Sequence, residues 1–234
     1  MGQITKDTID SALASGRTTL LEPEAKRVCK DYGIPTLPSG VARDAAEAVR
    51  IAEKIGYPVV MKVVSADIIH KTEAGAVALG VASADELRKA HYRIVESSLK
   101  FKPGASLEGV LIEKQASPGI EMIVGAKKDP QFGPTVMVGL GGIFVELFHD
   151  VAFGIVPLTE KQARKMIQET KSYQVLRGWR GKPPGDIEAL VKIMKAVSDL
   201  VAENPVIEEL DLNPVVVHER GASVVDSRIA VRKA

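Results

Sequence analysis

The sequence has little of what marks several large classes of protein. One cysteine, Cys29, is present among 234 residues, which excludes an intramolecular disulfide framework and is typical of a reducing compartment. Lys and Arg total 31 and Asp and Glu total 30, so no broad field draws the chain onto nucleic acid or an anionic membrane. No stretch approaches the roughly 18 consecutive apolar residues of a membrane span, and no apolar signal region is present. We expect a cytoplasmic, globular protein that binds neither nucleic acid nor membrane.

Periodicity and breaks at glycine and proline predict the elements. Helices are predicted from Glu24, with Cys29 buried and inert on the inward side, and over 44–55, 83–98, 160–170 and 186–203. Strands are predicted over 59–64, 75–81, 110–115, 121–127, 135–139 and 152–156, followed by short strands over 206–210, 215–218 and 223–225. This order indicates an α+β fold with a mostly antiparallel second sheet. We expect an N-terminal arm over 1–20, a small subdomain over 21–108 and a large subdomain over 109–234.

Two familiar nucleotide-binding motifs are missing. No G-x-x-x-x-G-K-[ST] sequence occurs, and Gly139-Leu140-Gly141-Gly142 lacks the glycine spacing of a dinucleotide fingerprint. This glycine-rich segment by itself fits a tight turn as well as it fits a ligand-binding loop.

Oxygen ligands are concentrated in the segment Glu208-Glu209-Leu210-Asp211-Leu212-Asn213-Pro214. Asp211 and Asn213 are two residues apart, so a strand would direct both side chains to one face. Asp226 follows on a predicted hairpin return that would bring its carboxylate beside Asn213. Two or three converging oxygens suit Mg²⁺, which completes its shell with nucleotide phosphates and water. The alternative is a solvated turn that contains an Asn-Pro pair.

Lys62 interrupts an otherwise apolar predicted strand, Val59-Val60-Met61-Lys62-Val63-Val64. An ammonium buried there needs a partner or a ligand, because an unpaired buried charge is costly. A phosphate is one such ligand. The alternative is a lysine that points outward from an edge strand.

His70 lies on the predicted loop between two strands, where a histidine is free to approach a substrate. Neutral imidazole is a competent nucleophile toward phosphorus, and Asp67 and Glu73 are near enough in sequence to orient it. The alternative is an ordinary surface histidine. We interpret the other histidines as ordinary surface residues: His91, His149 and His218.

Taken together, several segments between Leu21 and Val231 resemble the ATP-grasp domain of ADP-forming acyl-CoA synthetases and, more distantly, the β subunit of succinyl-CoA synthetase. The matching segments are Pro58-Val59-Val60-Met61-Lys62-Val63, Ile69-His70-Lys71-Thr72-Glu73-Ala74-Gly75, Asp129-Pro130-Gln131-Phe132-Gly133-Pro134, residues 139–147 and Glu209-Leu210-Asp211-Leu212-Asn213-Pro214. Any one match can arise by chance, but the ordered set does not. The resemblance implies an ATP-grasp fold of two subdomains.

The resemblance also implies a nucleotide site, for ADP and ATP. Lys62 would contact the phosphates, and Glu121 would bind the ribose. Glu113, with the backbone around Lys114 and Gln115, would hold the adenine.

A metal ion and a phosphoryl relay are implied in the same way. Asn213 and Asp226 match the family's Mg²⁺ ligands. Asp211 matches a carboxylate that stabilises a phosphohistidine delivered by the partner subunit. His70 matches a second phosphohistidine, which ADP-forming acetyl-CoA synthetases have and succinyl-CoA synthetase lacks.

The activity that the resemblance implies is reversible ATP formation, in which acyl-CoA, ADP and phosphate give the acid, CoA and ATP. Many relatives fuse this domain to CoA-binding and ligase regions, which this sequence does not contain. We therefore expect the nucleotide-binding β subunit of an acetate–CoA ligase. It would be active only with an α subunit that binds CoA and carries the first histidine, in an α2β2 assembly.

Two other functions fit parts of the pattern. One is a catalytically silent regulatory module, like the synthetase-derived region of certain protein acetyltransferases, and the presence of His70, Asp211, Asn213 and Asp226 argues against it. The other is an ATP-grasp ligase that forms an acyl phosphate on this chain and couples it to an amine. That enzyme would have no use for a loop histidine.

Overall fold

The computed structural model describes residues 2–142, 150–181 and 183–232 and divides the chain into two compact units. Unit 1 comprises Met1–Thr36 and Ser117–Ala234, and unit 2 comprises Leu37–Ala116. Each unit has its own sheet and its own cluster of buried apolar side chains. The predicted α+β class and the division into two subdomains are both present.

The boundaries of the units differ from the expected boundaries at 20/21 and 108/109. The first helices, α1 (Gln3–Ala14) and α2 (Glu22–Asp31), pack into the core of unit 1 through side chains such as Ile9 and Val28. Residues 1–20 are therefore part of that unit. Strand β4 (Gly109–Lys114) pairs with two strands of unit 2. It is therefore the last strand of unit 2 and does not belong to the large subdomain predicted to begin at residue 109.

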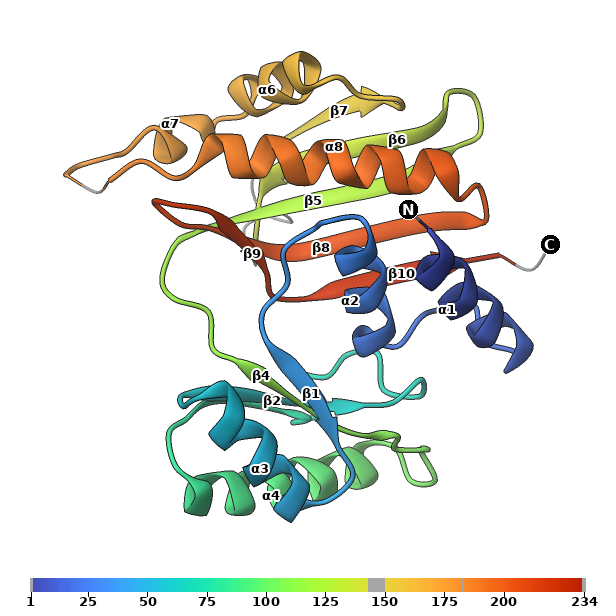
Figure 1. Cartoon of the computed structure of the whole chain (residues 1–234), viewed down its shortest axis with the longest axis vertical. Helices are drawn as coiled ribbons and strands as arrows, with labels where there is room; N and C mark the ends of the chain where they lie inside the picture. The colour runs from blue at the N-terminus through green and yellow to red at the C-terminus, as the bar shows by residue number, and fades with distance from the viewer. Residues whose placement is uncertain (1, 143–149, 182, 233–234) are drawn as a thin grey trace. The chain divides into compact units, whose positions relative to one another are not determined.

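A six-stranded antiparallel sheet is the framework of unit 1 (Figure 1). Its order is β10 (Ser227–Val231), β8 (Ile207–Val217), β5 (Ile120–Asp129), β6 (Gly133–Leu140) and β7 (Val151–Ile155), with β9 (Ala222–Val224) pairing with β8 off this path. The two short strands predicted over 206–210 and 215–218 form the single strand β8. Pairing with β5 and β10 holds the residues between them extended.

Helices cover one face of this sheet. α8 (Ile187–Glu203) lies along it, and α6 (Glu160–Glu169) packs beside α8, followed in the chain by the short helix α7 (Tyr173–Leu176) (Figure 1). Buried side chains recur at helical spacing along α8, Leu190 and Met194 among them. They share a core with alternate side chains of β5 and β8. The remaining side chains of those strands therefore face away from α8.

Unit 2 is a four-stranded antiparallel sheet packed against two helices. The strand order is β1 (Ser39–Ala42), β4, β2 (Val59–Val64) and β3 (Val77–Val81), and the helices are α3 (Ala45–Ile55) and α4 (Ala84–Phe101). β2 lies between β4 and β3, and all of its residues are buried. The loop of residues 65–76 connects β2 to β3.

Capping residues mark where both helices of unit 2 begin. The Asp44 carboxylate accepts a hydrogen bond from the Glu47 backbone N–H at 2.8 Å, and the Ser83 hydroxyl accepts one from Glu86 at 3.2 Å. Each side chain satisfies a backbone donor that the first turn leaves without an intrahelical partner. No helix in the described ranges combines the length and the apolar character needed to cross a bilayer.

Candidate functional site

Asp211 and Asn213 lie on the face of the unit 1 sheet that points away from α8. Between and beside them on β8, Leu210 and Leu212 are fully buried in the core that α8 shares, whereas Asp211 and Asn213 are half-buried. The alternation along β8 confirms that Asp211 and Asn213 share one face.

The hairpin return places Asp226 beside Asn213, as the spacing predicted. The Asn213 backbone N–H donates to the Asp226 carbonyl at 3.3 Å, and the Val225 N–H donates to the Pro214 carbonyl at 3.0 Å. The Asp226 carboxylate accepts a hydrogen bond from the Ser227 N–H at 2.8 Å. Strand pairing continues with Ser227 opposite Leu212. Three oxygen-bearing side chains therefore gather at one end of the β8–β10 ladder.

Asp211 is the most perturbed acid of this group. Burial raises its pKa to about 6, with further contributions from the negative charges of Asp226 and Glu209, while Arg228 acts in the opposite direction. Its Oδ1 atom is buried and has no hydrogen-bond partner among the described residues. A buried acceptor left in this state is costly unless a donor or a cation satisfies it. The site is thus suited to receive a positively charged or hydrogen-bond-donating group.

The glycine-rich segment joins this cluster to Glu121, a link that the sequence did not reveal. The Gly142 N–H donates to Asn213 Oδ1 at 3.0 Å, and the Gly141 N–H donates to the Glu121 carbonyl at 2.9 Å. Gly142 has φ of +65°, and a Cβ atom there would lie 2.7 Å from Glu121 Oε2. Only glycine lets this backbone pass between the two side chains. The run of glycines was the feature of the sequence that could have indicated this close contact.

The donors present suit Mg²⁺. Asn213 Oδ1 retains a second lone pair beside its bond to Gly142, and the Asp226 carboxylate is adjacent. Mg²⁺ takes one or two protein oxygens and completes its shell with phosphates and water. Within the described part of the chain no three His, Cys, Asp or Glu residues form a metal-binding group, so a cage built from such side chains alone is not offered there.

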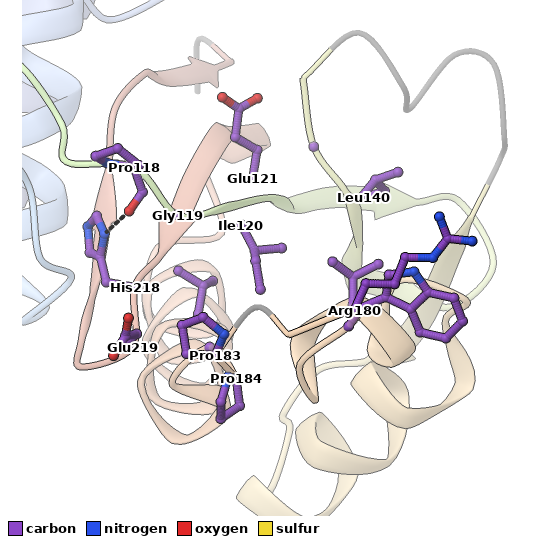
Figure 2. Close-up of a pocket in the computed structure, with 15 residues that line it drawn as sticks. Pro118, Gly119, Ile120, Glu121, Leu140, Arg180, Pro183, Pro184, His218 and Glu219 are labelled. Atoms are coloured by element: carbon purple, nitrogen blue, oxygen red, sulfur yellow. Dashed lines mark hydrogen bonds between the residues drawn. The ribbon is translucent and has the colours of Figure 1, made fainter.

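Glu121 also borders a cavity of about 890 Å³ in unit 1 (Figure 2). Its floor is mostly apolar, and Ile120 points into the region of Pro183 and Pro184, while Glu121 points to the opposite side of β5. The remaining lining residues are Pro118, Gly119, Leu140, Gly141, Val175, Trp179, Arg180, Gly185, Val217, His218 and Glu219. Among the predicted site residues, Glu121 lines this cavity.

Lys62 is buried inside the sheet of unit 2, not at an edge. Its Nζ lies 3.3 Å from Glu113 Oε2, and the two side chains are 7% and 1% exposed. The partner that a buried ammonium requires is thus supplied by the adjacent strand β4. Glu113 is also the residue expected to help hold adenine, and that role stays a prediction.

The backbone N–H groups of Lys114 and Gln115, also expected near adenine, bond within unit 2. They donate to the carbonyls of Pro38 and Pro58 at 2.9 and 3.2 Å. Their side chains are engaged as well, because Lys114 Nζ donates to the carbonyls of Gly56 and Tyr57 and Gln115 Oε1 accepts from Gly80. The strand end is consequently held in a fixed conformation.

His70 lies at the exposed tip of the loop between β2 and β3. The side chains of His70 and Glu73 are each 72% exposed, and Nδ1 of His70 lies 3.8 Å from Glu73 Oε1. Glu73 is therefore close to the imidazole, at a distance longer than a hydrogen bond, and its role in orienting His70 stays a prediction. Asp67, the other predicted partner, is bound instead to Lys102 and Ser106.

The remaining histidines and the cysteine have different surroundings. His91 is buried in α4, contrary to the surface position that we predicted, because its side of the helix faces α3 and the sheet. His218 is half-buried at the cavity, and His149 lies outside the described residues. Cys29 is fully buried, and burial raises its pKa to about 12, which confirms the predicted inert thiol.

Comparison with known proteins gives consistent matches along almost the whole chain. A family model described as an ATP-grasp domain matches residues 11–231. The β subunit of acetate–CoA ligase (ADP-forming) II from Pyrococcus furiosus is 49% identical over 227 residues, covering 96% of both chains. Acetate–CoA ligase (ADP-forming) I from Archaeoglobus fulgidus is 45% identical over 97% of this chain, which spans 33% of that longer protein.

Solved structures agree with these sequence matches. The dinucleotide-forming acetyl-coenzyme A synthetase 1 of Ca. Korarchaeum cryptofilum, in complex with coenzyme A, Ca-AMPCP and HgCl⁺, superposes with a TM-score of 0.95 at 45% identity, covering 97% of this chain and 100% of that one. A second structure of that enzyme, with coenzyme A and Mg-AMPPCP, has its phosphohistidine segment pointing towards the nucleotide-binding site. Its TM-score is 0.87 at 43% identity, over 97% and 99% of the two chains.

Proposed function

The chain belongs to the ATP-grasp family, among the β subunits of ADP-forming acetate–CoA ligases, and from this premise we propose that it converts ADP to ATP with a phosphoryl group carried by His70. The net reaction is acetyl-CoA, ADP and phosphate giving acetate, CoA and ATP. The observation that carries the proposal is the cluster of Asp211, Asn213 and Asp226 on the face of the unit 1 sheet away from α8, where one buried oxygen of Asp211 has no hydrogen-bond partner among the described residues.

The relay proceeds in two transfers through His70. A ring nitrogen of neutral His70 attacks the phosphorus of a phosphohistidine on the partner, forming one N–P bond as the other breaks. A terminal oxygen of ADP then attacks the same phosphorus, and His70 leaves as neutral imidazole. The exposed position of His70 permits both approaches, and the neighbouring Glu73 orients the ring. A similar segment in the Ca. Korarchaeum enzyme points towards its nucleotide site, which supports this assignment.

Residues of each unit have separate roles in binding Mg²⁺ and the nucleotide. Asn213 and Asp226 would hold Mg²⁺, which neutralises phosphate charge when bound. The Gly142 N–H fixes the orientation of the Asn213 amide, and Glu121 would accept hydrogen bonds from the ribose hydroxyls. In unit 2, Lys62 would contact phosphate while Glu113 holds its ammonium in place. The adenine would lie against the strand end at Lys114 and Gln115.

Asp211 would receive the phosphohistidine that the α subunit delivers. Its Oδ1 atom, for which residues 2–142, 150–181 and 183–232 supply no hydrogen-bond partner, can accept a hydrogen bond from the N–H of an imidazole whose other nitrogen carries the phosphoryl group. We propose that the α subunit binds CoA and performs the acyl chemistry, and that two copies of each subunit assemble as α2β2. The subunit names of the Pyrococcus relative and the longer single chain of the Archaeoglobus relative support the partner.

The test is to co-express the chain with its α subunit and to measure ATP formation from acetyl-CoA, phosphate and Mg-ADP. His70→Asn should lose activity by at least about a thousandfold, because the step has no alternative carrier. It should still bind Mg-ADP with wild-type affinity. His218→Asn is the matched control and should retain activity. Full turnover by His70→Asn would overturn the relay, and no ATP from any acyl-CoA would favour a regulatory module.

A further inference from the structure

Side-chain hydrogen bonds anchor the first part of the loop that carries His70. On the side that follows β2, Asp67 is held at three points: Lys102 Nζ donates to its carbonyl and to Oδ1, both at 3.2 Å, and the Ser106 N–H donates to Oδ2 at 2.9 Å. Ser65 completes the arrangement, since its hydroxyl donates to the Ser106 carbonyl at 2.7 Å and accepts from the Asp67 N–H at 3.1 Å. We call these four residues the Asp67 clamp.

Beyond the Asp67 clamp the chain forms a turn that bonds to itself. Backbone N–H groups of residues 71, 74, 75 and 76 donate to the carbonyls of residues 69, 70, 72 and 71. Buried residues stand on both sides of the exposed part of this turn, with Ile68 2% and Ala74 4% exposed, whereas Ile69 between them is 58% exposed. Residues 69–73 can therefore change direction while Ile68 and Ala74 stay in the core of unit 2.

Two features indicate that the Asp67 clamp affects the position of His70. It joins the His70 loop to the end of α4 and to the segment that follows it, through side chains of Lys102 and Asp67 that are 50% and 40% exposed, so the start of the turn is fixed to the helix. It also uses both carboxylate oxygens and the carbonyl of one residue, three positions before His70. A small displacement at Asp67 would therefore be passed on to the imidazole.

We propose that the Asp67 clamp is the fixed pivot for the movement of His70, and that Asp67 and Lys102 are positioning residues for phosphoryl transfer. This inference rests on the proposed function of His70. The clamp keeps residues 65–68 in place, so that His70 reorients within residues 69–73 and reaches a reproducible position. Near in-line transfer requires the reacting atoms at about 3 to 3.5 Å, and small misplacements cost large factors in rate.

The experiment compares two lysines at the end of α4 in the assembled enzyme. Lys102→Met breaks the clamp, whereas Lys100→Met removes an ion pair with Glu96 on the same helix. With acetyl-CoA, phosphate and Mg-ADP as substrates, Lys102→Met should lower kcat by about tenfold and leave KM for ADP unchanged. Lys100→Met should match the wild type. Lys102→Arg, which can still donate to Asp67, should recover most of the lost kcat.

Hydrogen exchange and a second variant separate positioning from simple destabilisation. Residues 65–68 should exchange faster in Lys102→Met and not in Lys100→Met. Asp67→Asn keeps an acceptor for Ser106 but loses its charge, and it should also lower kcat without changing KM for ADP. Wild-type kcat in Lys102→Met, or equal losses in both lysine variants, would overturn the pivot. His70→Asn, run in the same assay, distinguishes the two proposals: if it is inactive while Lys102→Met is fully active, the pivot fails and the relay stands. If His70→Asn is fully active, the relay itself fails.

Discussion

Gly142 connects two candidate ligand groups because it has no side chain. Its N–H bonds to Asn213, and its Cα faces the Glu121 carboxylate at a distance that excludes a methyl group. The contact orders the amide that we propose for metal binding and the carboxylate that we propose for ribose binding relative to each other. The glycine run therefore contacts residues of the candidate site in addition to forming a turn.

Gly142→Ala should therefore weaken nucleotide and metal binding together. The added Cβ would lie 2.7 Å from Glu121 Oε2, so the Glu121 carboxylate must shift, and φ of +65° is strained for alanine. We expect this strain to weaken the bond from residue 142 to Asn213. We expect Kd for Mg-ADP, measured by calorimetry, to rise about tenfold or more. Gly133→Ala is the control, since Gly133 has φ of +75° but no atom within 4 Å of the added Cβ. Equal effects in both variants would assign the loss to backbone strain.

His91 is predicted to make the protein less stable in mild acid. Burial lowers its pKa from the ordinary 6.5, with Asp44 opposing the shift, and neither ring nitrogen has a hydrogen-bond partner among the described residues. The folded state thus binds fewer protons than the unfolded state as the pH falls through 6.5, and stability is lost in that direction. His91→Leu should flatten the dependence of unfolding free energy on pH between 7.5 and 5.5, measured in urea. Parallel curves for the two proteins would contradict this.

The sequence supported some residue assignments and not others for a physical reason. Asp211 and Asn213 share a face because side chains alternate along any strand, and Asp226 follows from the hairpin return. The pairing of Lys62 with Glu113 depends on β2 lying beside β4, which residues far apart in the chain decide. The local sequence around Lys62 therefore does not reveal that β4 is its neighbour.

Helix α8 illustrates how much one element depends on its first turn. The Asp186 carboxylate accepts hydrogen bonds from the Ala189 N–H at 3.0 Å and from the Gly221 N–H at 2.8 Å. It therefore caps α8 and ties it to the turn between β8 and β9. The hydrogen bond from Gly221 has the largest effect and that from Ala189 the next largest, and both lower the pKa of Asp186 below its ordinary value of 3.8.

Asp186→Ala should destabilise unit 1 by about 1 to 2 kcal/mol at pH 7.5, because a helix cap and a tertiary bond are lost together. The lowered pKa means that this contribution is present above pH 3.8 and is lost as the pH falls further. Asp199→Ala, which removes an i,i+4 pair with Lys195 on the same helix, should cost only about 0.5 kcal/mol. Urea unfolding at pH 7.5 and 3 gives both values. A loss for Asp186→Ala no larger than that of the control would show that the cap contributes little.

Elements with strong periodicity were predictable, whereas weak ones were not. The helices over 44–55 and 186–203 match α3 and α8 within a residue or two, because apolar spacing and capping side chains act locally. The strand β1 was missed, since its four residues acquire their conformation by pairing with β4. Strand β8 was divided at Asp211–Pro214, where polar residues suggest a turn but two neighbouring strands keep the chain extended.

For the molecule as a whole, the division into two units depends on contacts that a linear pattern does not contain. Residues 1–36 join unit 1 although the rest of that unit begins at Ser117. Each unit carries a part of the proposed function: unit 2 has His70 and Lys62, and unit 1 has the cluster at Asp211.

The central claim is that His70 hands its phosphoryl group directly to ADP, and single-turnover transfer tests it most directly. The β subunit would be phosphorylated with ³²P-phosphate, acetyl-CoA and the α subunit, freed of the α subunit, and mixed with Mg-ADP in a rapid-quench instrument. We predict that label leaves His70 and appears in ATP at the same rate, with one ATP formed per phosphohistidine consumed. Label that stays on His70 while the complete enzyme still makes ATP would contradict the account.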